Sequence, residues 1–198
     1  LGNDLATLPD YPSEIRAPAG TIAGVSAFQL HFSSQDIKTP GDDLDVLVAM
    51  NAAALKVNLR DLKEGGIILV DLDGFKEKDL EKAGYTVNPL GDGSLGKYRV
   101  ISTDISEHTI RAVEPCGVTA KNAGRCKNFF TLGMMYWLYG RSPANTIDWI
   151  RKKFGKKPDI AAANEAAVIA GYNYCETAEI FETSYVVPKA PLVKGTYR

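Results

Sequence analysis

The sequence predicts an α/β fold, a three-layer sandwich with a mostly parallel central sheet and a helical C-terminal half. Two short apolar runs, residues 44–50 (LDVLVAM) and 67–71 (IILVD), have the length and composition of strands buried on both faces. A helical pattern lies between them, and helical spacing dominates again from residue 107 onward. Strands that alternate with helices over short connections are typical of parallel sheets with right-handed crossovers.

The first predicted strand covers residues 24–32 (GVSAFQLHF), where small or apolar residues alternate with polar ones. The segment before it, residues 11–21 (YPSEIRAPAGT), contains two prolines and a glycine, which favour a turn-rich loop. After the buried strand 44–50, Asn51 is a suitable N-cap, because its side-chain oxygen can accept a free N–H of a first helical turn. Apolar residues continue the helical spacing to Leu62, and we expect the Gly65-Gly66 pair to end this helix.

The sequence of the middle of the chain predicts one more helical crossover between strands. Residues 76–83 have a helical pattern that ends at Gly84, and residues 85–90 form a third strand candidate. Residues 91–96 (GDGSLG) form a turn, since neither a strand-to-helix context nor a GK[ST] sequence accompanies these glycines. Residues 98–105 (YRVISTDI) predict a further strand.

The C-terminal half predicts three long helices. The first covers residues 121–139 and stops at Gly140. The second covers residues 144–154 after Pro143, and the third runs from Pro158 to about residue 181, because proline is well tolerated in a first helical turn. The tail, residues 185–198, should be extended.

Composition limits the function classes. The chain has 198 residues, 45% of them hydrophobic, so it can bury a core. Its formal net charge of −1 argues against a general nucleic-acid binder but permits a local site for one small anion. The longest apolar stretch, residues 129–139, is shorter than the roughly 20 residues that cross a bilayer. We therefore expect neither a nucleic-acid nor a membrane partner.

The three cysteines, Cys116, Cys126 and Cys175, form no CxxC pair. This spacing predicts no zinc or iron–sulfur ligand set and no disulfide framework, and it favours reduced thiols in a cytoplasmic protein. Cys126 lies between Arg125 and Lys127, but neighbours in a helical sequence point apart. A packed thiol is the prediction there.

The loop 11–21 is the first candidate binding site. It combines the guanidinium of Arg16 with the hydroxyls of Ser13 and Thr21 and with Gly20. Arginine binds phosphate through two hydrogen bonds, and hydroxyl and backbone N–H groups can complete an anion site. A surface turn in which Glu14 pairs with the arginine explains the same residues, so the residues alone leave both interpretations open.

The ends of the buried strands provide weaker candidates. Asn51 follows a strand at the sheet edge where ligands collect in open α/β folds, although capping also explains it. Asp71 and Asp73 follow the next strand, but no calcium-type loop surrounds them, so we predict no metal site. His31 and His108 have no nucleophile or acid at a motif spacing, so no catalytic residue is assigned.

Several segments in order resemble the γ domain of 2-oxoacid:ferredoxin oxidoreductases. They are residues 10–32 (DYPSEIRAPAGTIAGVSAFQLHF), residues 39–55 with the DVLVAMN strand, residues 61–71 (DLKEGGIILVD), and the helical sequences at 125–141 and 164–177. The resemblance covers most of the chain and is greatest to the 2-oxoglutarate enzymes.

The resemblance implies that the assembled enzyme uses thiamine diphosphate, Mg, [4Fe-4S] clusters and coenzyme A (CoA) to convert 2-oxoglutarate reversibly to succinyl-CoA and CO2, with ferredoxin as electron carrier. It implies an α domain that binds thiamine diphosphate, a β subunit, and a dimer of γα–β pairs as partners. The cluster cysteines and the acidic thiamine-activating residues do not occur in this chain. The resemblance implies that this chain packs against the catalytic domains and helps to form the side of the active site that binds CoA. The candidate cofactor-binding residues are Arg16, Ser13, Thr21, Gly20 and Asn51.

Two departures from the family pattern affect the domain prediction. The glycine-rich turn that normally opens the γ domain is absent, and KGTYR at the end resembles the linker to an α domain in fused γα subunits. We therefore expect residues 1–184 to be a γ-type domain without its first turn, and 185–198 to be an extended linker. A γ subunit for pyruvate or another 2-oxoacid is one alternative, and a non-catalytic α/β module that binds a nucleotide or flavin is another.

Overall fold

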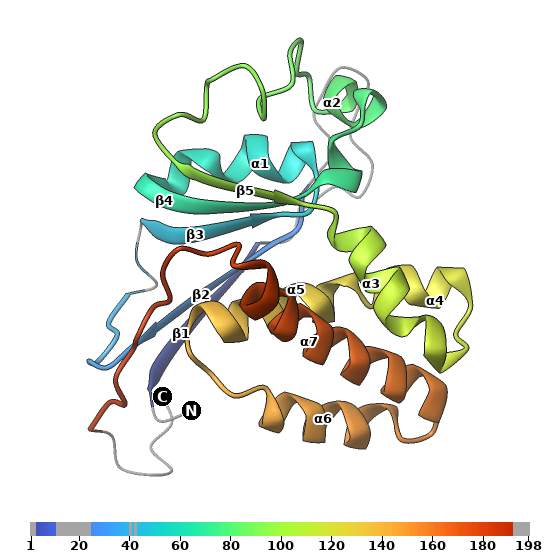
Figure 1. Ribbon diagram of the computed structural model, residues 1–198. Coiled ribbons are helices and arrows are strands. Elements are labelled where there is room, and N and C mark those ends of the chain that lie inside the picture. Colours follow the sequence, from blue (N-terminus) through green and yellow to red (C-terminus); the bar gives the residue numbers. More distant parts are fainter. Residues whose placement is uncertain (1–2, 11–24, 40, 42, 192–198) are drawn as a thin grey trace. The chain divides into compact units, whose positions relative to one another are not determined.

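A computed structural model describes residues 3–10, 25–39, 41 and 43–191 of the chain (Figure 1). The chain divides into two units, one made of Leu1–Ser102 with Val187–Arg198 and the other of Thr103–Val186. A three-stranded sheet with its helices characterises the first unit, and five helices characterise the described part of the second. These elements confirm the predicted α/β class with a mostly parallel sheet and a helical C-terminal half.

The three-stranded sheet has the order β3-β4-β5, from β3 (Leu44–Ala49), β4 (Leu62–Asp71) and β5 (Arg99–Thr103). β3 and β4 are parallel and are joined through α1 (Ala52–Asn58), as the alternation of patterns predicts. Ile68, Leu69 and Val70 are completely buried, which explains why β4 reads as a continuous apolar run. The core of this unit joins residues of the sheet, of α1 and of the following turns (Leu47, Ala49, Leu55, Ile68, Val70, Phe75 and Leu95).

The predicted end of the first helix is wrong. α1 stops at Asn58, a 3₁₀ turn covers Leu59–Asp61, and β4 already begins at the buried Leu62. The glycine pair therefore lies within β4, where the register moves from Leu44↔Leu62 to Val46↔Ile67. Gly65 has a φ of 75°, which glycine adopts without a steric penalty, so the pair permits an irregularity inside the strand.

The helix predicted at 76–83 is confirmed as α2 (Glu77–Lys82), and Gly84 follows it with a φ of 70°. The strand predicted at residues 85–90 is wrong, because these residues form turns and bends. Asn88 Oδ1 accepts a hydrogen bond from Leu90 N at 3.0 Å, a local contact that competes with strand pairing. The strand predicted at 98–105 is confirmed as β5, and the turn at 91–96 is also confirmed.

A second, two-stranded sheet belongs to the same unit. β1 (Asp4–Asp10) pairs antiparallel with β2 (Ala27–Ser33), from Asp4↔Ser33 to Asp10↔Ala27. β2 confirms the strand predicted near 24–32, whereas β1 was not predicted. We call this pair the β1–β2 ribbon.

The helical unit is built around one long helix. Its elements are α3 (Ile105–Val113), α4 (Ala120–Arg125), α5 (Lys127–Leu138), α6 (Ala144–Phe154) and α7 (Pro158–Ala178). α7 packs against α3, α5 and α6. The single helix predicted at 121–139 is wrong in one respect, since it is interrupted at Cys126. The predicted starts of α6 and α7 are confirmed, and α7 ends three residues earlier than predicted, at Ala178.

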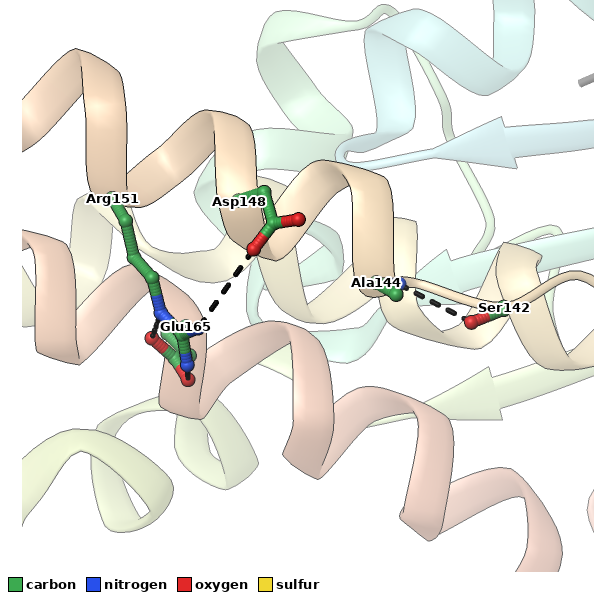
Figure 2. Close-up of polar contacts among 5 residues, drawn as sticks. All are labelled: Ser142, Ala144, Asp148, Arg151 and Glu165. Atoms are coloured by element: carbon green, nitrogen blue, oxygen red, sulfur yellow. Dashed lines mark hydrogen bonds and ion pairs between the residues drawn. The ribbon is translucent and has the colours of Figure 1, made fainter.

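Charged side chains reinforce the packing of α6 on α7, as Figure 2 shows. Arg151 Nε donates to Glu165 Oε2 at 2.9 Å, and Arg151 also lies 3.8 Å from Asp148. Ser142 Oγ accepts a hydrogen bond from Ala144 N at the start of α6. No helix in the described ranges combines the length and apolar character that a membrane crossing requires.

Candidate functional site

The loop predicted to bind an anion connects the two strands of the ribbon. Its candidate residues Ser13, Arg16, Gly20 and Thr21 lie outside the described residues. The strands on either side are described: β1 ends at Asp10, and β2 begins at Ala27 directly opposite. Antiparallel pairing thus brings the two ends of the segment between them together.

Asn51 lies at the carboxyl end of β3 and caps α1. Its backbone is extended, with φ −161° and ψ 168°, and its Oδ1 accepts a hydrogen bond from Ala54 N at 2.8 Å. This contact satisfies one of the N–H groups that a helix leaves unpaired at its start, which confirms the predicted cap. The residue is exposed, and capping alone accounts for its identity.

The turn after β4 packs directly on the turn after β3. A Cβ added to Gly74 would lie 2.3 Å from Met50 O and 2.7 Å from Asn51 Cα, so only a glycine permits this contact. Asp71 is completely buried, and its Oδ1 accepts a hydrogen bond from Asp73 N at 3.4 Å. The two strand-end turns therefore form one packed edge of the sheet.

The aspartates at this edge have structural contacts. Asp71 caps the short turn that follows β4, and Asp73 forms an ion pair with Lys76. In the described part of the chain, no three His, Cys, Asp or Glu residues are grouped so as to hold a metal ion. These contacts give both aspartates structural roles.

The sequence did not predict a cluster around His108 in the helical unit. The ring of His108 lies 4.4 Å from that of Tyr174, and Tyr174 Oη shares a 2.8 Å hydrogen bond with Thr103 Oγ1. The rings of Phe130 and Tyr174 are 5.9 Å apart. These residues come from β5, α3, α5 and α7, so no local sequence pattern could have indicated them. The cluster joins the helices to one another.

Cys126 is a packed thiol, as predicted, and Cys175 is buried as well, whereas Cys116 is half-buried. The Sγ of Cys126 donates to Asn122 O at 3.3 Å, and burial, with a further contribution from Cys116, raises its pKa. Burial also raises the pKa of Cys175 to about 12. Both side chains are buried and protonated at neutral pH, which makes them poor nucleophiles and poor metal ligands.

Comparison with known proteins identifies the family. The family model described as pyruvate ferredoxin/flavodoxin oxidoreductase matches residues 1–174. The chain is 51% identical over 198 residues to the 2-oxoglutarate oxidoreductase subunit KorA of Mycobacterium tuberculosis (strain ATCC 25618 / H37Rv). That match covers 100% of this chain and 30% of the relative, so the chain spans about a third of the relative's length.

Two solved structures have a similar fold. The 2-oxoglutarate:ferredoxin oxidoreductase from Magnetococcus marinus, with 2-oxoglutarate, coenzyme A and succinyl-CoA bound, matches with a TM-score of 0.67 and 21% identity, over 96% of this chain and 28% of that one. The γ subunit of a keto/oxoacid ferredoxin oxidoreductase from Geobacter sulfurreducens PCA matches with a TM-score of 0.54 and 19% identity, over 87% of this chain and 80% of that one. At such identities the likeness concerns the fold. From the family model and the relative, we conclude that this chain belongs to the pyruvate ferredoxin/flavodoxin oxidoreductase family.

Proposed function

We propose that the chain is the γ part of a thiamine-diphosphate-dependent 2-oxoacid:ferredoxin oxidoreductase that acts on 2-oxoglutarate. The observation that carries this proposal is the 51% identity to a 2-oxoglutarate oxidoreductase subunit along all 198 residues. In the proposed reaction the bond between the 2-oxo carbon and the carboxylate breaks and CO2 leaves. The acyl group forms a thioester with coenzyme A, and oxidised ferredoxin accepts the electrons.

The described residues do not fit an iron–sulfur cluster or Mg-bound thiamine diphosphate. Two of the three cysteines are buried and protonated, and the described residues contain no acidic or cysteine cluster that could hold a metal. We therefore assign no step through those groups to this chain. In the proposal they belong to the α domain and the β subunit, with γα–β pairs forming a dimer.

The part we assign to this chain is the coenzyme-A side. Arg16, Ser13, Gly20 and Thr21 would bind a phosphate of coenzyme A, through the guanidinium, the two hydroxyls and the backbone N–H groups. Arg–phosphate hydrogen bonds are charge-assisted and directional, which suits the anchoring of a flexible anionic ligand. Asn51 is the second candidate contact.

The Arg16→Ala enzyme should have a higher KM for coenzyme A. Removing a charge-assisted hydrogen bond costs about 1.5–3 kcal/mol, which corresponds to roughly a ten- to hundredfold increase. Arg60→Ala is the matched control, because that guanidinium is 82% exposed and pairs only with its neighbour Asp61 among the described residues. Thiamine content should remain unchanged in both variants. A KM for coenzyme A equal to that of the unmodified enzyme would refute the role of Arg16.

The substrate assignment is tested on the natively purified complex. We expect reduction of ferredoxin, or of a viologen dye, to depend on coenzyme A and to be faster with 2-oxoglutarate than with pyruvate, branched-chain or aryl 2-oxoacids. Faster reduction with pyruvate would support the proposed type of reaction but show that the substrate is pyruvate. No reduction with any 2-oxoacid, by a complex that retains thiamine and clusters, would refute the proposed function and leave a binding module.

A further inference from the structure

One face of the β1–β2 ribbon is apolar. The register places Leu5 opposite Phe32, Thr7 opposite Leu30 and Pro9 opposite Phe28. Side chains alternate between the two faces of a strand, and directly paired residues share a face. These six residues therefore form one surface, which we call the ribbon face: Leu5, Thr7, Pro9, Phe28, Leu30 and Phe32.

Most of the ribbon face is open to solvent, although Phe32 is half-buried. Phe28 is 63% exposed, Leu5 53% and Leu30 49%. On the opposite face Ala6, Gln29 and His31 are half-buried, and Gln29 Nε2 donates to Gly41 O at 3.0 Å, while Leu8 on that face is exposed. Exposed phenylalanine and leucine side chains on adjacent strands form the kind of contiguous apolar patch that marks an interaction surface.

Two physical arguments indicate a permanent partner. The six residues include no charged side chain, whereas interfaces that form and dissociate are generally richer in polar groups than obligate ones. A two-stranded ribbon is also only marginally stable in water and gains stability when one face packs on another surface. A transient electron carrier or a charged ligand does not suit this surface.

Two relatives, in which the matched part belongs to a longer polypeptide, indicate the partner, whereas the Geobacter sulfurreducens γ subunit is matched over 80% of its length. This chain covers 30% of the Mycobacterium tuberculosis subunit and 28% of the Magnetococcus marinus chain, so most of each polypeptide lies outside the matched part. We propose that the ribbon face packs against an apolar surface of another domain of the same long subunit. This inference rests on the proposed function for the identity of the assembly.

Hydroxyl-radical footprinting of the assembled enzyme tests the contact. Trp149 and Val87, which are 47% and 60% exposed, serve as internal references after correction for the reactivity of each residue type. Interface cores exclude water. We therefore expect the modification rate of Phe28 to be at least about five times lower than its exposed fraction in this chain alone predicts. Modification of Phe28 at the rate set by the references would overturn the proposal.

The occupant is identified by cross-linking. A photoreactive benzoylphenylalanine at position 28 should form cross-links to peptides of the same subunit beyond the 198 residues. Cross-links between the ribbons of two copies would mean that the face is a dimer contact, and cross-links only to a separate subunit would assign it to a different chain. Either result would overturn the proposed occupant.

A double variant tests whether the apolar side chains hold the contact. Phe28→Ser with Leu30→Ser should increase modification of Leu5, the third exposed large apolar residue of the face, by about fivefold, since its cover is lost. Trp149→Ser is the matched control and should leave Leu5 protected. Circular dichroism establishes that each variant is folded. An unchanged Leu5 in a folded double variant would overturn the proposal, whereas a failure of the enzyme to use any 2-oxoacid would refute only the proposed function.

Discussion

The thiol of Cys175 is fully buried in α7, and burial raises its pKa from about 9 to about 12. Cys126 has the cations Arg125 and Lys127 as sequence neighbours, which would favour a thiolate if they faced it. Its pKa is nevertheless raised, because burial disfavours the thiolate, with a further contribution from Cys116. For the pKa of this thiol, burial outweighs the positive charge of the adjacent residues.

Alkaline stability should reveal the buried thiol. In the unfolded chain Cys175 loses its proton near pH 9, while in the folded chain it keeps the proton to about pH 12. The unfolded state then binds fewer protons, so the free energy of unfolding is unaffected below pH 9 and falls as the pH rises through this window. Urea unfolding at increasing pH should show a smaller fall for Cys175→Ala. Equal slopes in the two proteins would contradict the assigned pKa.

Asn51 offers a test that separates capping from ligand binding. Asn51→Ala should lower the free energy of unfolding by about 1 kcal/mol, and Asn51→Ser should restore most of it, since serine is also a good N-cap. If the amide also contacts coenzyme A, the serine variant will be stable but have a higher KM for it. A serine enzyme with normal stability and normal KM would restrict Asn51 to its structural role.

α5 and α7 pack with their backbones close together. A Cβ on Gly133 would lie 2.1 Å from Val168 O, and one on Gly171 would lie 1.9 Å from Phe130 O. The obstacles are backbone atoms, so the helices must separate to admit a methyl group. Gly124, in α4, has no atom within 4 Å of such a Cβ.

Alanine substitutions at these glycines should therefore change the free energy of unfolding in opposite directions, depending on the space at each position. Gly133→Ala or Gly171→Ala should lower the free energy of unfolding by about 3 kcal/mol, as expected when a packed interface is overfilled. Gly124→Ala should raise it by about 0.5–1 kcal/mol, because alanine favours the helix and nothing obstructs it. Chemical unfolding of the three variants measures both effects. Destabilisation by all three would mean that helix spacing does not decide the outcome.

The elements that the sequence predicted are those with a strong local signal. β4 reads as an apolar run because both of its faces are buried over residues 66–71, and Pro158 marks the start of α7. β1 carries Pro9 and exposed residues on most of its length, so its pattern lacks the alternation of a half-buried strand. Its pairing with β2 joins residues that are up to 29 positions apart, which no local pattern reports. The glycine pair Gly65-Gly66 led to a wrong helix end, because glycine is common both after helices and at irregularities within strands.

The candidate site was predictable in part. The capping role of Asn51 follows from residue type and position, and the structure confirms it. The cluster of His108, Tyr174 and Thr103 depends on the packing of helices and could not be predicted from spacing. The phosphate-binding role of Arg16 remains a prediction, because it depends on a loop outside the described residues.

For the molecule as a whole, the exposed ribbon face should affect solubility. The purified 198-residue chain should bind the dye anilinonaphthalene sulfonate, because Phe28, Leu5 and Leu30 present apolar surface to water. The Phe28→Ser, Leu30→Ser variant should bind about half as much dye or less. It should also stay soluble up to a higher protein concentration before it aggregates. Fluorescence titration measures the former and light scattering the latter. Unchanged dye binding would place the exposed apolar surface elsewhere.

The antiparallel register of the ribbon also limits how the gene can change in length. Insertion or deletion of one codon within β1 or β2 would shift the pairing by one residue and turn Leu5 or Phe28 to the opposite face. The same change between the strands leaves every pair from Asp4↔Ser33 to Asp10↔Ala27 in place. Length variation among natural members of this family should accordingly be concentrated between the two strands and rare within them.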